Sequence, residues 1–553
     1  MRNRLAAVLF IPLLACPEPE PGSGWVRSVP ADSLVLADTN AFDLEGRGLR
    51  FVPTPSGYDV TVLDSSAFEP DGEDAYFTTD LVLPFDFPFA GTSWKQAWID
   101  PGGRLVFGPP ENVSWSPQTL WPTGTMHDVA SAFRTRAATG IDRTIAVFWG
   151  IYEATHTAIT SRADHVTITW RNLRPTPHSF SFEPNGWCTF QVALFADGVI
   201  ELRYEQVPEL DGIVGVFTGA PSETMLPAGG DLSSGGSFSG DAFEVFHHPL
   251  ISTEFADLLP PVFERFAPED DFVVLLTDFR IDTLWGVTAT TGAVGTPIMG
   301  LGDSAYFPYP GSAFGSERLQ AAVLPIWVGQ PAFNELVSDK DRPYQEHAFA
   351  VGLLAHELTH RWGPGISTIV SESGEQVPLV EDACACHWNR WLNAPAVHPV
   401  ASTYSPRLYP ESSVMGGSTF EEVEPGIFTV RDAPYMAPAG FSALDLYLMG
   451  VIGPEEVPDT FLLRDVRYLD GDRVQATKVP VRISDIVAEM GPRIPDHLSS
   501  QRTFQLGVYL LHRGDGPDPE ALRRADRIAE ELAAFFDAAT ASGIRLVPPA
   551  ARQ

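Results

Sequence analysis

A five-residue pattern inside an apolar helical run constrains this chain more than any other feature. His356, Glu357 and His360 form an H-E-x-x-H motif. Residues four apart lie on one face of an α-helix, so both imidazoles can reach a single metal ion. Imidazole nitrogen is a preferred Zn²⁺ ligand, and the adjacent carboxylate is placed to act as a general base. The motif therefore predicts a zinc site with His356 and His360 as ligands and Glu357 as the base.

The residues around the motif indicate a buried helix over 344–362 and not a solvated surface helix. Apolar side chains precede and follow the motif, at Leu353, Leu354, Ala355, Leu358 and Trp362. Such apolar density on all faces is typical of a buried helix. Histidine and glutamate buried there without partners would be costly, and a metal ion would relieve that cost. Gly363 and Pro364 then predict the end of the helix.

A catalytic zinc ion needs three protein ligands and an open position, so a third ligand must lie outside the motif. Asp445 is favoured, because it is a single carboxylate in the apolar helical run 441–449 and a buried carboxylate needs a partner. The alternative is that Asp445 caps this helix together with Ser442. His387, beside Trp388, suits either a ligand or a hydrogen-bond donor to the oxyanion of the reaction.

Two known ligand patterns match the chain only in part. The metzincin pattern continues as far as Gly363, but its third histidine would fall on Ile366. Glu381 lies near the spacing of the third ligand in thermolysin-like enzymes, yet Ala385 stands where that pattern has aspartate. Glu381 therefore remains a weaker candidate than Asp445.

The size and charge of the chain limit its organisation and its partners. A chain of 553 residues is too long for one ordinary core, so about two to four domains are expected. The formal net charge of −35 disfavours nucleic acid and anionic lipid as direct partners. Such acidity is compatible with Ca²⁺ binding, but the chain contains no D-x-D-x-D-G loop to support it.

The first fifteen residues have the pattern of an export signal. Arg2 and Arg4 precede a short apolar stretch that ends in Leu-Leu-Ala-Cys at Cys16. This ending resembles a bacterial lipobox, which implies cleavage before Cys16, lipid on that cysteine and a tether over 16–44. The protein would then be exported and anchored by lipid, at the bacterial outer membrane or cell surface. The alternative is a plain secretory signal that happens to end in cysteine.

Three cysteines remain if Cys16 carries lipid. Cys188, Cys384 and Cys386 are an odd number, so they cannot all pair internally. Cys384 and Cys386 are too close for an easy mutual disulfide, whereas a bridge from Cys188 to either is feasible. Cys384, Cys386 and His387 also form a weak indication of a second metal site, because C-x-C lacks the usual C-x-x-C spacing.

Residues 45–250 read as an all-β module. Apolar runs alternate with turn signals, including Asp197-Gly198 between two alternating segments. Short strands in this order predict a β-sandwich. The sequence Leu-Pro-Phe-Asp-Phe-Pro-Phe at 83–89 and the hairpin over 190–204 resemble nidogen-like extracellular domains, which implies an adhesive or packing module without catalytic residues.

Residues 255–545 follow a different pattern. Strands are expected at 272–276 and 321–327, followed by helices at 344–362, 441–449 and 518–540. Strands before an H-E-x-x-H helix and further helices after it fit the zincin arrangement. The fold expected for the whole chain is therefore multidomain, with an all-β sandwich followed by an α+β zincin-like domain.

A more specific resemblance covers residues 340–540. The helix with His-Glu-Leu-Thr-His-Arg-Trp, the later His-Trp pair, Ser-Val-Met-Gly-Gly at 413–417 and Phe-Ser-Ala-Leu-Asp-Leu-Tyr-Leu-Met-Gly at 441–450 occur in this order. This order resembles a group of secreted bacterial zincin-like metallopeptidases. The resemblance supports His356, Glu357 and His360 and points to His387 and Asp445 as site elements. Tyr447 is a further candidate, since a tyrosine hydroxyl can stabilise an oxyanion.

These observations predict a peptidase with one catalytic Zn²⁺ that acts on proteins or peptides. The main alternative is an adhesion lipoprotein whose zincin-like domain no longer catalyses. A zinc hydrolase of a non-peptide amide is a second alternative, since the chemistry at zinc is the same.

Overall fold

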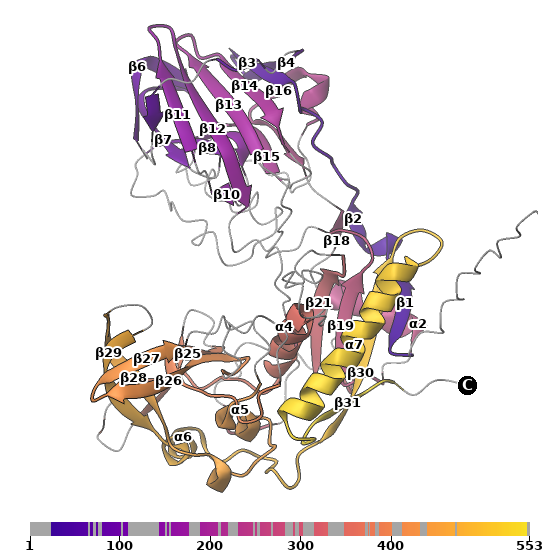
Figure 1. The fold of residues 1–553 in the computed structure, drawn as a ribbon. Helices are drawn as coiled ribbons and strands as arrows, with labels where there is room; N and C mark the ends of the chain where they lie inside the picture. Colours follow the sequence, from indigo (N-terminus) through magenta and orange to yellow (C-terminus); the bar gives the residue numbers. More distant parts are fainter. Residues whose placement is uncertain are drawn as a thin grey trace, which may run out of the picture.

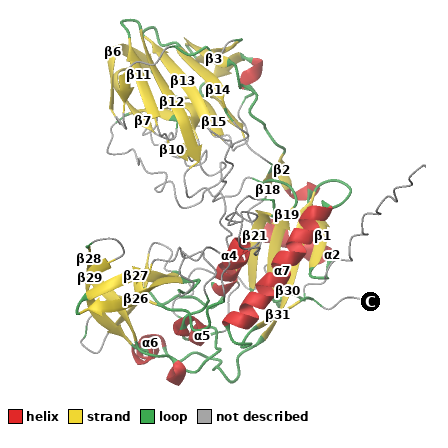
Figure 2. Ribbon diagram, viewed as in Figure 1, coloured by secondary structure: helices red, strands yellow, loops and turns green. Residues whose placement is uncertain are grey.

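The structure of the chain is a computed structural model. The structure describes residues 24–64, 67–69, 73–75, 80–100, 103–108, 143–149, 152–153, 156–175, 188–207, 212–218, 230–246, 249–251, 255–266, 269–281, 291–293, 298–301, 314–329, 348–370, 374, 376–381, 386–400, 412–431, 440–469 and 473–549. These residues form a β-rich protein of several sheets with few helices, so the multidomain, β-rich part of the expected fold is confirmed (Figures 1 and 2).

Two sheets between residues 48 and 246 face each other and form a β-sandwich (Figure 1). The first has the order β16-β4-β3-β14-β13-β12-β11-β5, with β10 on β12, and the second has the order β17-β15-β9-β8-β7-β6. Their bounds are β3 Gly48–Thr54, β4 Gly57–Leu63, β5 Glu73–Ala75, β6 Asp80–Phe89, β7 Thr92–Asp100, β8 Arg104–Phe107, β9 Arg143–Trp149, β10 Tyr152–Glu153, β11 His156–Ser161, β12 His165–Pro175, β13 Cys188–Phe195, β14 Ile200–Gln206, β15 Gly212–Phe217, β16 Gly236–Ser239 and β17 Ala242–Phe246.

The space between the two sheets is filled by aromatic and aliphatic side chains. Phe51 and Trp170 come from one sheet and Phe107 and Phe148 from the other, and none is more than 1% exposed. The hydroxyl of Tyr204 on β14 donates to the carbonyl of Val147 on β9 at 2.7 Å, so a hydrogen bond also joins the sheets. Buried and exposed positions alternate along β4 and β6, which is the pattern that the sequence offered for this module.

A second unit is built on a mostly parallel sheet in the order β1-β30-β19-β21-β20, with β31 on β30. The strands are β1 Val26–Pro30, β19 Phe272–Thr277, β20 Thr291–Ala293, β21 Ala321–Trp327, β30 Thr503–His512 and β31 Arg545–Val547. All pairs are parallel except β20 with β21, which is antiparallel at the edge.

Helices cover both faces of this sheet. On β19, Phe272, Val274 and Leu276 face the core shared with α4 (Ala348–Thr359) and α7 (Pro519–Ala539). Val273 and Leu275 point to the other face, where α2 (Phe255–Arg265) contributes Leu258 and Leu259 to a separate core. A strand buried on both faces reads as a continuous apolar run, as Phe272–Thr277 does.

The first strand of this second sheet corrects the prediction that residues 16–44 form a tether. Residues 16–23 lie outside the described residues, but Val26–Pro30 is β1 and pairs in parallel with β30. Val29 is 2% exposed and belongs to the core beneath α2. Farther along, β2 (Val35–Ala37) pairs with β18 (Leu250–Ile251), where the chain returns from the sandwich. The sandwich is therefore an insertion between β1 and the rest of this sheet. The prediction failed because β1 is stabilised by pairing with β30, far along the chain, although the local sequence is Pro-rich and typical of a loop.

A third region is a curled sheet in the order β24-β25-β26-β27-β29-β28, in which β28 also pairs with β25 at Leu462 and Leu392 (Figure 1). Its strands are β24 Val380–Glu381, β25 His387–Asn393, β26 Gly416–Glu424, β27 Ile427–Arg431, β28 Thr460–Tyr468 and β29 Arg473–Val481. The hairpin β22 (Thr368–Val370) and β23 (Gln376–Pro378) precedes it. Short helices α5 (Ala443–Leu448), η6 (Pro454–Glu456) and α6 (Ile483–Met490) lie beside this sheet.

Candidate metal centre

Helix α4 carries the motif on a buried surface. It contacts β21 and α7, and Leu354, Ala355 and Leu358 are fully buried against them. His356 is 3% exposed and Glu357 6% exposed, as expected for a buried helix. The α-helix ends at Thr359, and His360 lies on the following turn, with its backbone N–H 3.3 Å from the carbonyl of His356.

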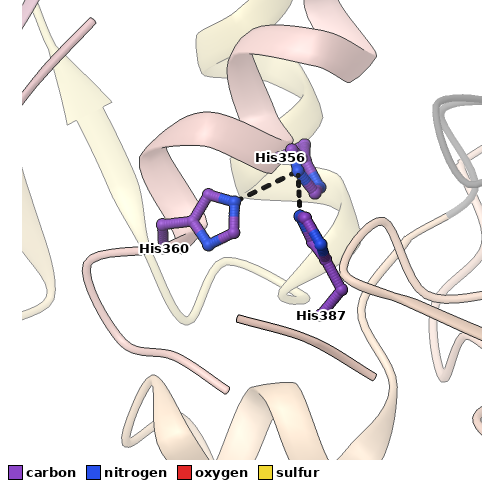
Figure 3. Close-up of side chains that lie close together, drawn as sticks. All are labelled: His356, His360 and His387. Carbon is purple, nitrogen blue, oxygen red and sulfur yellow. Dashed lines mark hydrogen bonds between the residues drawn. The ribbon is translucent and has the colours of Figure 1, made fainter. Parts of the chain in front are cut away.

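Three imidazoles meet at the end of α4 (Figure 3). Nε2 of His356 lies 3.1 Å from Nε2 of His360 and 3.1 Å from Nε2 of His387. All three ring nitrogens lie within 4.8 Å of one another. His387 is the first residue of β25 and reaches the helix from the curled sheet. The third member of the cluster therefore comes from a different part of the fold.

The hydrogen bond on the far side of His356 sets which nitrogen faces the cluster. Nδ1 of His356 lies 2.7 Å from the carbonyl oxygen of Val414. A carbonyl oxygen can only accept, so Nδ1 carries the proton and Nε2 presents its lone pair to the cluster. Such a carbonyl partner behind a histidine is typical of metal ligands, because it orients the ring and fixes its tautomer.

Burial favours the neutral form of His356 and His360. It lowers the pKa of His356 to about 3, with the neighbouring His387 as a second cause. Burial, together with His356 and His387, also places the pKa of His360 well below its ordinary value. Neutral imidazole rings can present ring-nitrogen lone pairs to a shared cation. They are also the form in which histidine binds a metal.

The spacing of the cluster fits a zinc ion. Tetrahedral zinc with Zn–N bonds of about 2.0–2.1 Å separates two ligand nitrogens by about 3.3 Å. Nε2 of His356 lies 3.1 Å from Nε2 of His360 and from Nε2 of His387. His356, His360 and His387 would hold the ion, which leaves one of four positions for a water molecule or a substrate. This is the ligand count of a catalytic site and not of a closed structural one.

The structure corrects the prediction that Asp445 is the third ligand. Among the described residues, the metal-binding group at α4 comprises the three histidines without Asp445. The Asp445 carboxylate is 2% exposed and accepts hydrogen bonds from the indole N–H of Trp388 at 2.7 Å and the hydroxyl of Ser413 at 2.6 Å. It also accepts from both the backbone N–H and the hydroxyl of Ser442 at 2.7 Å. These donors satisfy the buried carboxylate, so it needs no metal.

Asp445 instead joins the segments that surround the three histidines. It closes a capping box with Ser442 at the start of α5, which is the alternative role considered from the sequence. Its partner Trp388 follows His387, and its partner Ser413 precedes Val414, whose carbonyl accepts from His356. Burial raises the pKa of Asp445, while the bonds from Ser413, Ser442 and Trp388 act in the opposite direction.

The turn at residues 413–417 is the part of the site that sequence reasoning missed. The backbone N–H of Met415 donates to the Ser413 hydroxyl at 2.9 Å, and the N–H of Trp388 donates to the Met415 carbonyl at 2.9 Å. Gly416 and Gly417 have φ of +98° and +77°, which favours glycine. Ser-Val-Met-Gly-Gly was therefore the available signal, but a backbone carbonyl partner cannot be recognised from residue type.

Tyr447 does not face the three histidines through its hydroxyl. That oxygen accepts from the backbone N–H of Arg493 at 3.1 Å, and Tyr447 lines a cavity on that side of α5. The prediction that Tyr447 donates to an oxyanion is corrected, because α5 directs Asp445 and Tyr447 toward different neighbours. His387 instead lies with His356 and His360 in a group that could hold a metal ion.

The remaining sequence-based candidates have mixed outcomes. Glu381 ends β24, and its backbone pairs with His387, but its side chain lies outside the described residues. Cys386 is disulfide-bonded, whereas Cys188 is free and buried, so a bridge from Cys188 is wrong. Burial raises the pKa of the Cys188 thiol to about 12. A disulfide sulfur is not a thiolate ligand, which also removes Cys386 from a second metal site.

The isolated histidines of the sandwich fall in two groups. His165 is 8% exposed and bonds Glu69 at 3.0 Å and Asp164 at 2.9 Å, so it is a paired residue at the start of β12. The side chains of the other three lie outside the described residues, at positions 127, 156 and 178.

The export signal and Cys16 also lie outside the described residues. Within the part of the chain that the structure describes, no helix is long and apolar enough to span a membrane. No protein-family model, curated protein or solved structure matches this chain.

Proposed function

We propose that this chain is a zinc-dependent peptidase, exported and held at a membrane surface by lipid on Cys16. The observation that carries the proposal is the meeting of three imidazoles, from His356, His360 and His387, beside the buried residue Glu357. His356 and Glu357 lie on α4, His360 lies on the turn that follows it, and His387 comes from another sheet. This combination is typical of a catalytic zinc site with an open position.

The fold around α4 supports a zincin-like assignment of residues 255–545. The helix packs on a mostly parallel sheet with one antiparallel edge strand, β20, and contacts both β20 and β21. Residues after the helix supply the last ligand, as expected for that arrangement. The three histidines of the cluster all come from residues 348–393, outside the sandwich.

Each residue of the proposed site has a separate task. When bound, zinc would polarise the scissile carbonyl and lower the pKa of the attacking water. Glu357 takes a proton from that water and delivers it to the leaving amine, so one carboxylate serves both halves of the reaction. Val414 orients His356, and Asp445 holds the turn that contains Val414 next to the strand that begins with His387.

The proposed substrate is a protein or peptide outside the cell. The formal net charge of −35 disfavours nucleic acid as a partner. Anchoring through Cys16 would keep the second sheet near the membrane, since only nine residues separate Cys16 from β1 at Val26.

The decisive experiment compares the full chain with its Glu357→Gln variant. Glutamine preserves shape but cannot take the proton, so the variant is expected to retain one zinc ion per chain and to lose peptide hydrolysis by a factor of about 10² or more. Zinc is measured by inductively coupled plasma mass spectrometry, and hydrolysis is measured on a library of quenched fluorescent peptides. Hydrolysis by Glu357→Gln at the wild-type rate would overturn the mechanism. A chain without stoichiometric zinc would favour an adhesive protein with a non-catalytic domain.

A further inference from the structure

A cavity of about 410 Å³ opens on the side of α5 away from the Asp445 carboxylate, and the proposed hydrolysis does not use it. Its walls are mainly apolar and come from α5, from Ile452 and η6, from α6 and from the segment after α6. The apolar wall residues are Tyr447, Ile452, Pro454, Ile483, Val487 and Pro492. Cavities of this size with apolar walls and few polar groups are typical of ligand sites.

The mouth of the cavity is acidic. Glu455 and Asp496 are exposed lining residues, and ligand atoms of Glu455, Glu456 and His497 lie within 4.8 Å of one another. The cationic lining residue, Arg493, is 5% exposed and donates from its guanidinium to the carbonyls of Leu448 and Pro495 and to the hydroxyl of Ser500. Its charge is therefore directed into the protein, and the carboxylates dominate the mouth.

Exposed apolar side chains continue beyond the cavity. Ile494 and Leu498 stand next to lining residues in the sequence and are 50% and 82% exposed. Met299, 62% exposed, pairs with Ile494 through two backbone hydrogen bonds of 2.9 and 3.1 Å. Clustered exposed apolar side chains with polar residues beside them mark interaction surfaces. A small ligand would fill the cavity and leave these side chains uncovered, whereas a chain could cover both.

We propose that the cavity and this apolar strip form a docking site for a polypeptide segment. The segment inserts one aromatic or large aliphatic side chain between Ile452, Ile483 and Val487, and it places lysine or arginine next to Glu455 and Asp496. Burial of the apolar anchor supplies most of the affinity, and the charges select basic segments over acidic ones. Docking requires neither zinc nor Glu357, so the proposal stands apart from the proposed hydrolysis.

The test titrates the full-length Glu357→Gln chain, which keeps the probe intact, with a dye-labelled peptide of sequence Gly-Lys-Lys-Trp-Lys-Lys-Gly, followed by fluorescence anisotropy. Replacing the tryptophan of the peptide by serine is expected to weaken binding about tenfold or more, because the apolar anchor is lost. Replacing its four lysines by glutamate should weaken binding at least as much, and added salt should weaken it progressively.

Two pairs of protein variants locate the site. Ser484→Phe fills the mouth from an exposed position on α6 and should weaken binding about tenfold. Ala488→Phe adds the same ring at an exposed α6 residue that does not line the cavity and should change affinity less than about twofold. Glu455→Lys should weaken binding about fivefold. Glu489→Lys, at a residue of the same helix as Ala488, changes the net charge of the protein equally and should weaken binding only through that change.

Three results would overturn the proposal. The first is no saturable binding of the tryptophan peptide at millimolar concentration. The second is equal affinity for the tryptophan and serine peptides, which would show simple charge attraction. The third is equal loss of affinity in the Ser484→Phe and Ala488→Phe variants. The peptide substitutions need no change to the protein, so they give a result even if a protein variant fails to fold.

Discussion

Replacement of Asp445 by alanine is expected to weaken zinc binding although all three imidazoles remain. The carboxylate accepts four hydrogen bonds in a fully buried position, and the substitution removes all of them. The hydroxyls of Ser413 and Ser442 can rotate toward other acceptors. The indole N–H of Trp388 and the backbone N–H of Ser442 cannot, so two buried donors lose their partner.

The size of the effect follows from these two donors. Each buried donor left without a partner costs about 1–3 kcal/mol, which places the loss of folding free energy at about 2–6 kcal/mol. Trp388 adjoins His387 and Ser413 adjoins Val414, so the same change loosens the third ligand and the carbonyl behind His356. Loss of such supporting contacts typically lowers metal affinity about 10- to 100-fold.

The assay measures the zinc dissociation constant by competition with a chromophoric chelator, at a temperature where circular dichroism shows the variant folded. Asp526→Ala is the matched control, because Asp526 is a buried aspartate on α7 that accepts from the backbone N–H of Val26. It should lower the unfolding midpoint without changing zinc affinity. Asp445→Asn should fall between wild type and Asp445→Ala. An unchanged zinc dissociation constant in folded Asp445→Ala would refute the reasoning.

Three further predictions concern the zinc ligands, the pH dependence of stability and the place of β1 in the second sheet. His387→Ala should lower the zinc content below one ion per chain, whereas replacement of the exposed His398 should not. Atomic absorption measures the zinc content of both variants. The unfolded state takes up protons below about pH 6.5, and folded His356 does so only near its pKa of about 3. The urea concentration at the unfolding midpoint of the zinc-free chain should therefore decrease as the pH is lowered between these two values. A midpoint that stays constant from pH 7 to 5 would contradict this. Val29→Asp should lower amide protection in β30 and leave β13 unchanged in hydrogen exchange, because β1 belongs to the second sheet.

Strands and helices with a clear apolar period were predictable from local sequence. The strand expected at 321–327 is β21, and the helices expected at 441–449 and 518–540 are α5 and α7 within one or two residues. The helix expected at 344–362 is α4, described from Ala348 to Thr359. On α7 the buried side chains recur with the helical period, whereas β21 and α4 were recognised from continuous apolar runs because they are buried on more than one face.

Elements that depend on distant partners were not predictable. Val26–Pro30 has little apolar pattern of its own and becomes a strand because it pairs with β30, nearly five hundred positions later. Likewise, a lone carboxylate in an apolar helix has the same sequence signature whether it binds a metal or accepts hydrogen bonds. Only the arrival of Trp388, Ser413 and Ser442 around Asp445 distinguishes the two roles.

The sequence by itself determined the pair His356 and His360 and the carboxylate of Glu357, because a helix places residues four apart on one face whatever surrounds it. Only the tertiary structure decided the third histidine, His387, since β25 reaches α4 through the pairing of a separate sheet. The same packing decided that Asp445 supports the site from behind, where buried donors satisfy its charge.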